Sequence, residues 1–389
     1  MLNDKRRNPV LASLSLLTVA ALYGLPFLQI APNRMVSGQP IYFLAVVQGM
    51  GSLPLMLLLT PSIACFFKPT RVWLGASLLT ASLAIPSLLW LAASQAGFSL
   101  QSESPIARAA LGSAFWVVLV LLGFIASTAL QLLRASALQV VLVCAALLLA
   151  VGLLLASGVC GDLSLMKEYA NRADSFGQVI TRHAQIVLLA LACTLAVGLP
   201  LGWAAHTQAK ISRALLPVLN IIQTIPSVAL FGLLMAPLAL LAASVPALGR
   251  AGISGVGLAP AVIALTLYGL LPVVRGTLAG LQQVPSAMVQ AARALGLTQF
   301  QILFHVELPL AVPVLLGGVR TAAVSSVGLA AVTALIGAGG LGSVLFEGLF
   351  ANAQDLVLLG VLPIIALGVV VDALFMVLMN LARRRVKPW

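Results

Sequence analysis

The hydrophobic pattern of this chain consists of apolar runs that are each about as long as a membrane helix. Long apolar runs are separated by shorter stretches that hold most of the charged residues. Runs near 20 residues match a bilayer core of roughly 30 Å, and backbone groups in lipid must bond within their own segment. We therefore expect an all-α polytopic membrane protein of about ten spans, near residues 10–30, 42–60, 72–94, 109–132, 136–159, 185–205, 213–240, 257–274, 311–335 and 355–381.

Composition supports lipid as the solvent. Hydrophobic residues make up 61% of the 389 positions and charged residues 8%, whereas soluble domains carry about 25% charged residues. The net charge of +12 does not indicate nucleic acid, because the Lys and Arg residues lie mostly beside apolar runs rather than in one patch. No clustered Cys, His, Asp and Glu ligands indicate a metal site, and no nucleophile–base–acid set can be assembled.

The basic residues also predict an orientation. When the spans alternate, most Lys and Arg residues fall on the side that holds both chain ends, as at Lys5, Arg6 and Arg7 and at 383–387. Because positive residues flank membrane spans on the cytoplasmic side, both termini are expected there. The apolar run after Arg7 is long for a cleaved signal peptide, and we interpret it as a retained anchor.

Three parts follow from this pattern. Residues 1–160 carry five spans and few polar motifs, residues 161–184 form a polar loop outside the cytoplasm, and residues 185–389 carry five more spans. The last part includes a long cytoplasmic connection, 275–310, that is too polar to span and too long for a simple turn.

This connection predicts two short helices with a sharp turn between them. Pro285 and Ser286 are suited to opening a helix, and Gly296 is suited to ending it. Thr298 is a candidate cap for a second helix, which we expect to stop before Pro309.

The same connection resembles the EAA-x-x-x-G-x9-I-x-LP motif of ABC importer permeases. The matching residues keep the motif's spacing, with Gln in place of Glu and Val in place of Ile: Gln290, Ala291, Ala292, Gly296, Val306, Leu308 and Pro309. The resemblance implies that this element is a coupling helix that docks in a groove of an ATPase subunit. Arg293 would offer a charged contact there, and the missing Glu carboxylate puts any role of that charge in doubt. The alternative is an ordinary amphipathic loop helix.

Further segments extend the resemblance to the osmoprotectant branch, the glycine betaine and choline permeases. They are NIIQTIPSVALFG (220–232), LYGLLPVVRGT (267–277), GVRTAAV (318–324) and LIGAGGLG (335–342), and the five-span extension resembles the YehY-type subtype. The resemblance implies a MetI-like permease core in the C-terminal half and a place in the bacterial inner membrane. It implies a chain that is not itself an enzyme, with ATP and Mg bound on a separate cytoplasmic ATPase. An extracytoplasmic binding protein and a second permease copy or paralogue are the other implied partners.

Polar residues in the seventh run are candidates for a substrate pathway: Asn220, Gln223, Thr224, Pro226 and Ser227. Polar side chains within a membrane tend to face the bundle interior or a cavity. The alternative is that they hold helices together, which needs the same residue types.

Two further candidates are structural. Arg320 and Asp372 lie at similar depth in their spans, and we expect them to pair because an unpaired charge there would cost at least roughly 2.5–3.5 kcal/mol. A glycine-rich turn is expected on the outer side near the pathway, formed by Gly337, Gly339, Gly340 and Gly342, with simple loop flexibility as the alternative. It lacks the GK[ST] ending of a nucleotide-binding loop.

Two other classes of function remain as alternatives. An ion-coupled secondary transporter would show repeated halves and several intramembrane carboxylates, whereas only Asp372 is clearly acidic within a span. A non-transporting scaffold would show no solute flux. Within the importer class, another small polar solute such as an amino acid is the runner-up. No aromatic cage for a quaternary ammonium group is visible, which agrees with the implied architecture, in which a separate extracytoplasmic binding protein supplies recognition.

Overall fold

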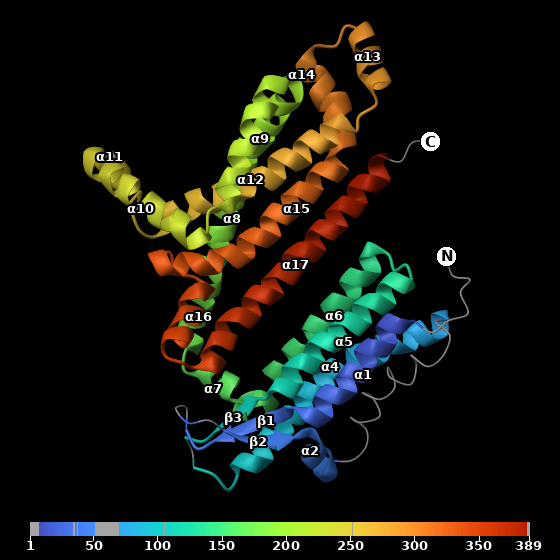
Figure 1. Cartoon of the computed structure of the whole chain (residues 1–389), viewed down its shortest axis with the longest axis vertical. Coiled ribbons are helices and arrows are strands. Elements are labelled where there is room, and N and C mark those ends of the chain that lie inside the picture. The colour runs from blue at the N-terminus through green and yellow to red at the C-terminus, as the bar shows by residue number, and fades with distance from the viewer. Residues whose placement is uncertain are drawn as a thin grey trace. The chain divides into compact units, whose positions relative to one another are not determined.

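The computed structural model describes residues 8–33, 36, 38–50, 70–104, 106–250 and 252–386 (Figure 1). The chain forms two compact units that meet in sequence between Arg172 and Ala173. Unit 1 denotes the part up to Arg172 and unit 2 the part from Ala173. Each unit is built around helices and is described by itself.

Unit 1 combines helices with a small sheet. Its elements are α1 (Pro9–Gly24), β1 (Pro26–Ala31), β2 (Gln39–Tyr42), α2 (Phe43–Met50), α4 (Arg71–Leu100), β3 (Arg108–Leu111), α5 (Ser113–Leu132), α6 (Ala137–Ala156), a 3-10 turn (Val159–Asp162) and α7 (Ser164–Ala170). Helix α4 packs against α5 and α6, and α1 packs against α5. The second expected span, 42–60, begins at the last residue of β2 and continues through α2, and its part from residue 51 lies outside the described residues.

The sheet was not expected from the sequence. Strand β1 lies between β2 and β3, antiparallel to both, so that Leu28 pairs with Ile41 on one side and Leu111 on the other. The run 10–30 is therefore a 16-residue helix followed by a strand. Helix α1 ends where Leu25 turns to extended backbone, because the residue before a proline is driven out of the helical region and Pro26 follows.

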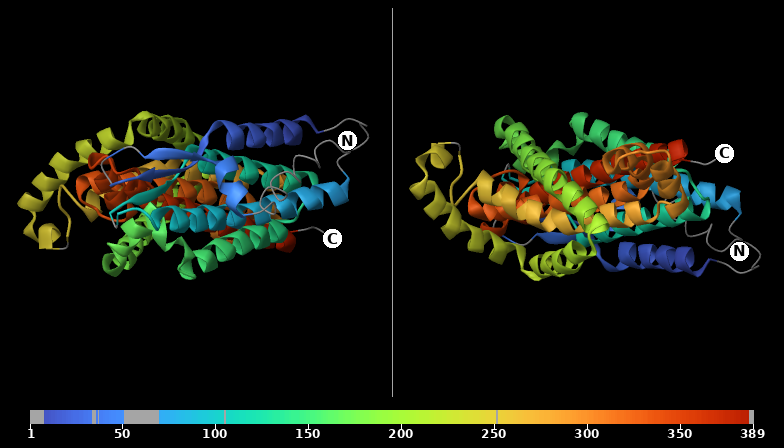
Figure 2. Two further views of the ribbon diagram at one scale, coloured as in Figure 1. Left: turned by 90° about the horizontal axis from the view of Figure 1, so that it is seen from below. Right: turned by 90° about the horizontal axis from the view of Figure 1, so that it is seen from above.

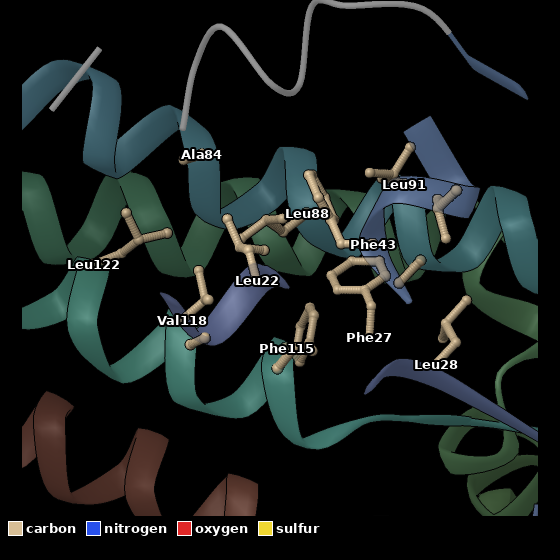
Figure 3. Packing of buried hydrophobic residues seen from close by; sticks show 14 of the residues in the cluster. Leu22, Phe27, Leu28, Phe43, Ala84, Leu88, Leu91, Phe115, Val118 and Leu122 are labelled. Atoms are coloured by element: carbon tan, nitrogen blue, oxygen red, sulfur yellow. The ribbon is translucent and has the colours of Figure 1, made fainter. Parts of the chain in front are cut away.

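The core of unit 1 lies where α1, α4 and α5 meet the sheet (Figure 3). Phe27 of β1 is fully buried, and its ring lies edge-on to Phe43 at 5.3 Å and to Phe115 at 6.1 Å between ring centroids. Such edge-to-face pairs add about 0.5–1.5 kcal/mol beyond burial. Leu88 and Leu91 of α4 complete this cluster. The strand thus carries the aromatic centre of the unit.

The secondary-structure elements in the described part of unit 2 are all helical. Its elements are α8 (Ala173–Thr207), α9 (Ala209–Thr224), α10 (Ser227–Ser244), α11 (Pro246–Arg250), α12 (Leu258–Gln282), α13 (Ser286–Ala294), α14 (Gln299–Ile302), a π turn (Leu303–Glu307), α15 (Leu308–Val332), a 3-10 turn (Thr333–Ile336), α16 (Leu341–Phe350) and α17 (Gln354–Val386). Figures 1 and 2 show α10 and α11 extending away from the other helices of this unit.

Helix α12 is the centre of unit 2, packed between α8 and α15. The backbones of α12 and α15 approach so closely at Gly276 and Gly318 that a Cβ on Gly276 would lie 2.8 Å from the Gly318 Cα. Small residues permit this approach, which dispersion contacts then stabilise in lipid. The close packing fixes α15 beside α12, and both helices line the cavity described below.

A helical membrane protein is confirmed. Within the described residues, eight helices are long and apolar enough to cross a membrane: 71–100, 113–132, 137–156, 173–207, 227–244, 258–282, 299–336 and 354–384. The run 213–240 is broken into α9 and α10 at Ile225 and Pro226. Proline lacks an N–H and excludes helical backbone before it, which accounts for the break.

Three boundaries were wrong. Residues 173–184, expected in a loop, belong to α8, and residues 275–282, expected in the cytoplasmic connection, belong to α12. Both stretches are polar enough to resemble loops yet contain residues that favour helix. The helix after Thr298 does not stop before Pro309 but continues into α15.

Candidate functional site

The connection between α12 and α15 is a helical hairpin, defined here as residues 285–307. Helix α13 ends in a Schellman motif: the Leu297 N–H donates to the Ala292 carbonyl at 3.2 Å and the Gly296 N–H to the Arg293 carbonyl at 2.9 Å. Gly296 has φ +79°, a left-handed conformation that favours glycine, as this cap requires. The sharp turn expected at Gly296 is present.

The second half of the hairpin begins with a capping box. The Thr298 hydroxyl accepts from the Gln301 N–H, and the Gln301 side chain accepts from the Thr298 N–H at 2.8 Å. The π turn Leu303–Glu307 then leads into α15, and the Leu308 N–H donates to the Leu303 carbonyl. Pro309 follows in the first turn of α15, where a missing N–H costs little. Because the π turn just before Pro309 already departs from regular α-helical bonding, the missing N–H of the proline does not end the helix.

The hairpin rests on the end of α8. Trp203 and Phe300 lie with ring centroids 5.4 Å apart, and His206 Nε2 lies 3.9 Å from Glu307 Oε1. A cavity of about 230 Å³ lies at this contact; its lining residues are Trp203, His206, Thr207, Arg293, Gln299, Ile302 and Glu307. The hairpin therefore contacts two spans, α8 and α15, at once.

Most of the expected coupling residues face outward. Gln290, Ala291, Arg293 and Gly296 are exposed, whereas Ala292 is buried. Beside them the Leu295 side chain is 81% exposed. Figure 1 shows α13 at one end of unit 2, beyond the ends of α12 and α15. Leu308 and Pro309 begin α15, where Leu308 is partly buried and Pro309 is exposed.

A second feature is a cavity of about 470 Å³ between α9, α12 and α15. It is lined by polar and apolar residues from all three helices: Gln223, Tyr268, Gly269, Leu271, Pro272, Arg275, Thr321, Ala322, Ser325, Ser326 and Leu329. Of the five pathway candidates, Gln223 is the one that lines it. Asn220 is not a lining residue, but it contacts one, because its Oδ1 accepts a hydrogen bond from Arg275 Nη2 at 2.9 Å.

The other pathway candidates form the break between α9 and α10. The Thr224 hydroxyl donates to the Ile221 carbonyl at 2.7 Å, within its own helix. Pro226 caps α10 and Ser227 is its first residue. Across the break, the Tyr268 hydroxyl donates to the Ile225 carbonyl, and Gln223 Nε2 donates to the Tyr268 carbonyl at 2.9 Å. These bonds hold α12 to the break.

Sequence reasoning missed several lining residues of this cavity. Tyr268 and Arg275 are seven residues apart on α12, and Thr321 and Ser325 are four apart on α15. Both spacings put polar residues on one face of a helix. This periodicity was the available signal, but the expected boundaries placed Arg275 in the cytoplasmic connection.

Arg320 and Asp372 face one another between α15 and α17. Arg320 Nε donates to Asp372 Oδ1 at 2.6 Å and Nη2 to Oδ2 at 2.7 Å. Two parallel N–H···O bonds give the geometry that arginine and carboxylate favour. The pairing expected from the sequence is thus present, between helices that also pack along their length.

The glycine turn joins three helices. Gly337, Gly339 and Gly340 have positive φ. The Arg182 Nε of α8 donates to the Ala338 carbonyl at 2.9 Å, and the Ile336 carbonyl accepts from Gly257 N–H, before α12, at 2.7 Å. At Gly342 a Cβ would lie 1.9 Å from the Ala331 carbonyl oxygen. The turn is therefore tightly held, unlike a flexible loop.

Helices long enough to span a membrane, a cavity with polar lining residues and an exposed hairpin are together typical of a helical transport protein. Residues 5–166 match the family described as the N-terminal domain of ABC transporter permease YehY. Residues 195–388 match the binding-protein-dependent transport system inner membrane component. The resemblance to ABC importer permeases with a YehY-type extension is confirmed.

Relatives of known function resemble about half of the chain. It is 37% identical over 202 residues to the osmoprotectant import permease protein OsmW of Salmonella typhimurium, covering 52% of this chain and 89% of the relative. It is 34% identical over 215 residues to the choline transport system permease protein OpuBD of Bacillus subtilis, covering 54% and 86%.

A solved chain of the MetNI methionine ABC transporter, in an inward-facing conformation, is 22% identical with a TM-score of 0.47, covering 55% of this chain and 98% of that one. From the family profile and the relatives together, the chain belongs to the binding-protein-dependent transport system inner membrane components, the permeases of ABC importers.

Proposed function

We propose that this chain is the permease subunit through which an ATP-driven importer moves an osmoprotectant, such as glycine betaine or choline, across the bacterial inner membrane. The observation that carries this proposal is the hairpin 285–307, which keeps the spacing of the importer motif and ends α13 at Gly296. Relatives named for osmoprotectant and choline transport support the solute class.

The hairpin is proposed to dock on a separate cytoplasmic ATPase that binds ATP and Mg. Exposed Gln290, Ala291 and Arg293 would face that subunit, and the exposed Leu295 would give an apolar contact. Movement of the hairpin would reach α8 through Trp203 and α15 through the π turn. Gln290 carries no charge, so docking here rests on shape and on Arg293 rather than on a glutamate.

The remaining parts of the assembly follow from this arrangement. A binding protein outside the cell would deliver the solute, and a second permease copy or paralogue would complete the pathway. Both chain ends would lie in the cytoplasm, on the side of the hairpin, and the glycine turn on the opposite side. The exposed apolar residues of α10, such as Leu233 and Leu240, offer a surface for the second copy or for lipid.

Reconstitution tests this function. The permease, its ATPase and its binding protein are placed in proteoliposomes, and uptake of labelled glycine betaine, choline and an amino acid is followed with and without ATP. We expect uptake of the quaternary ammonium solutes that needs both ATP and the binding protein. Uptake of an amino acid alone would identify the runner-up solute class, and uptake driven by an ion gradient without the ATPase would contradict the importer mechanism.

A further inference from the structure

The cavity between α9, α12 and α15 carries a positive charge that no acidic residue balances. Arg275 is charged, and no Asp or Glu is among the described residues that line the cavity. Asp372 is engaged by both oxygens with Arg320. Arg275 is exposed at this cavity, and a guanidinium with no carboxylate beside it can take an anionic partner through charge-assisted hydrogen bonds. The cavity is therefore suited to the negative end of a solute.

The guanidinium of Arg275 is held in place but keeps free donors. Arg275 Nη2 donates to Asn220 Oδ1 at 2.9 Å, and within the part of the chain that the structure describes this is its one hydrogen bond. A guanidinium has five N–H donors in a planar fork that matches a carboxylate. Asn220 thus fixes the side chain across two helices and leaves an edge for a ligand.

Hydroxyl groups lie on the opposite wall. Thr321, Ser325 and Ser326 of α15 line the same cavity. The Thr321 hydroxyl donates to the Gly317 carbonyl at 3.0 Å and can therefore only accept from a ligand, whereas a serine hydroxyl can donate or accept. Tyr268 is the one aromatic residue among the described lining residues. Recognition of a quaternary ammonium group usually takes a cage of several aromatic rings. The cavity therefore offers more to a carboxylate than to the ammonium end.

We propose that Arg275 is a specificity-determining residue that holds the carboxylate of the solute in this cavity, so that carboxylated zwitterions pass in preference to cationic alcohols. Asn220 acts as its positioning residue. This inference rests on the proposed function and narrows its solute class. Among quaternary ammonium solutes, glycine betaine and carnitine carry the carboxylate and choline does not.

The test uses the whole reconstituted complex with one binding protein. Uptake of glycine betaine, carnitine and choline is compared for the unchanged protein, Arg275→Gln, Arg275→Lys and Asn220→Asp. The last is nearly isosteric and places a competing carboxylate on the guanidinium. Arg213→Gln is the matched control, because Arg213 lies on α9 outside the cavity and donates to Ala209 of its own helix. ATP hydrolysis stimulated by the binding protein reports intact assembly.

We expect Arg275→Gln and Asn220→Asp to lower uptake of both carboxylated solutes by about tenfold or more, the range for a lost charged hydrogen bond. Choline uptake and stimulated hydrolysis should persist, and Arg275→Lys should restore part of the carboxylate uptake. Three results would overturn the role assigned to Arg275: choline uptake that falls as much as uptake of the carboxylated solutes, ATP hydrolysis that the binding protein no longer stimulates, or uptake of the carboxylated solutes that does not change. If the unchanged protein takes up none of the three solutes with ATP, the proposed function itself fails.

Discussion

At the scale of single residues, Gly296 and Cys160 show how local environment limits substitution and chemistry. Gly296 has left-handed backbone, and no atom lies within 4 Å of the place that a Cβ would occupy, so its requirement for glycine is conformational rather than steric. Cys160, after α6, is instead fully buried within the core of unit 1. Gly296 therefore shapes the hairpin, and Cys160 is a probe of packing in the core of unit 1.

Replacing Gly296 with Ala should impair coupling. A non-glycine residue in this backbone region costs about 1–2 kcal/mol, enough to shift a conformational equilibrium by about 5- to 30-fold. We expect ATP-dependent uptake to fall within that range while the protein still inserts. The matched control is Gly177→Ala, because Gly177 lies within α8 with ordinary backbone and open space around it. Equal uptake by the two variants would refute a coupling role for the turn.

Cys160 should react with thiol reagents only at high pH. Burial raises the pKa of its thiol, and the thiolate is the reactive form. The test compares two chains that each keep one cysteine, with all other cysteines replaced by serine. One chain keeps Cys160, and the other carries Ser157→Cys together with Cys160→Ser, because Ser157 is an exposed residue nearby. Alkylation of Cys160 should begin at a higher pH than alkylation of the cysteine at position 157. Mass spectrometry after N-ethylmaleimide treatment measures both. Identical pH profiles would contradict the burial of Cys160.

The raised pKa of the Cys160 thiol also makes the stability of the protein depend on pH. Because the folded protein holds the proton more tightly than the unfolded chain, the folded state binds more protons as the thiol titrates. The contribution of Cys160 to stability is therefore present below the ordinary thiol pKa and is lost as pH rises through the raised value.

At the scale of elements, charges and caps determine how the helices fit together. The Arg320–Asp372 pair joins α15 to α17, and capping residues define the two short helices of the hairpin. Helix α12, in contrast, is held by close backbone approach to α15. These contacts respond differently to substitution.

Asp372→Asn should destabilise unit 2 by leaving Arg320 unpaired in the membrane. The expected cost is about 2.5–3.5 kcal/mol, seen as a lower unfolding temperature of the purified protein and lower abundance in membranes. The double variant Arg320→Leu with Asp372→Leu removes both charges and should recover most of the stability. If the double variant is no more stable than the single one, the pair is not the source of the loss.

The hairpin could be predicted closely because its signals are local. Pro285, Thr298 and Gly296 each favour one backbone geometry regardless of what surrounds them, and α13 and α14 begin and end beside them. Pro309 was misread, since a proline can either end a helix or occupy its first turn. The choice was decided by the π turn before it, which no sequence period indicates.

The sheet and the cavity could not be predicted in the same way. Apolar residues such as Phe27 and Leu28 suit a buried strand as well as a membrane helix, and short runs do not distinguish the two. Arg275 follows the end of an apolar run, yet α12 continues to Gln282. Its contact with Asn220 joins residues 55 positions apart, and only the packed structure brings them together.

At the scale of the whole molecule, the chain is divided into two units. Each has its own hydrophobic core, with Phe27 and Phe115 in unit 1 and Phe231 and Leu265 in unit 2. The hairpin and the cavity both lie in unit 2. Relatives such as OsmW match about half of this chain over 89% of their own length, so a permease does not require the other half.

Residues 173–389 expressed alone should therefore insert in the membrane and support ATP-dependent uptake. Uptake per assembled complex, measured in proteoliposomes beside the full chain, tests this, and detergent gel filtration checks that the shortened protein is folded. A folded, ATPase-bound chain that moves no solute would show that unit 1 takes part in translocation. Equal uptake would leave unit 1 a role in regulation or assembly.

The continuous helix from Gln299 to Ile336 has 38 residues. It is not one straight rod, because the π turn Leu303–Glu307 lies within it, and Figure 1 shows α14 at an angle to α15. The 25 residues of α15 extend about 38 Å at 1.5 Å per residue, which already exceeds the roughly 30 Å of the hydrocarbon core. Residues 299–307 are therefore not needed to cross the bilayer, and water at its surface is the medium in which a soluble protein would meet them.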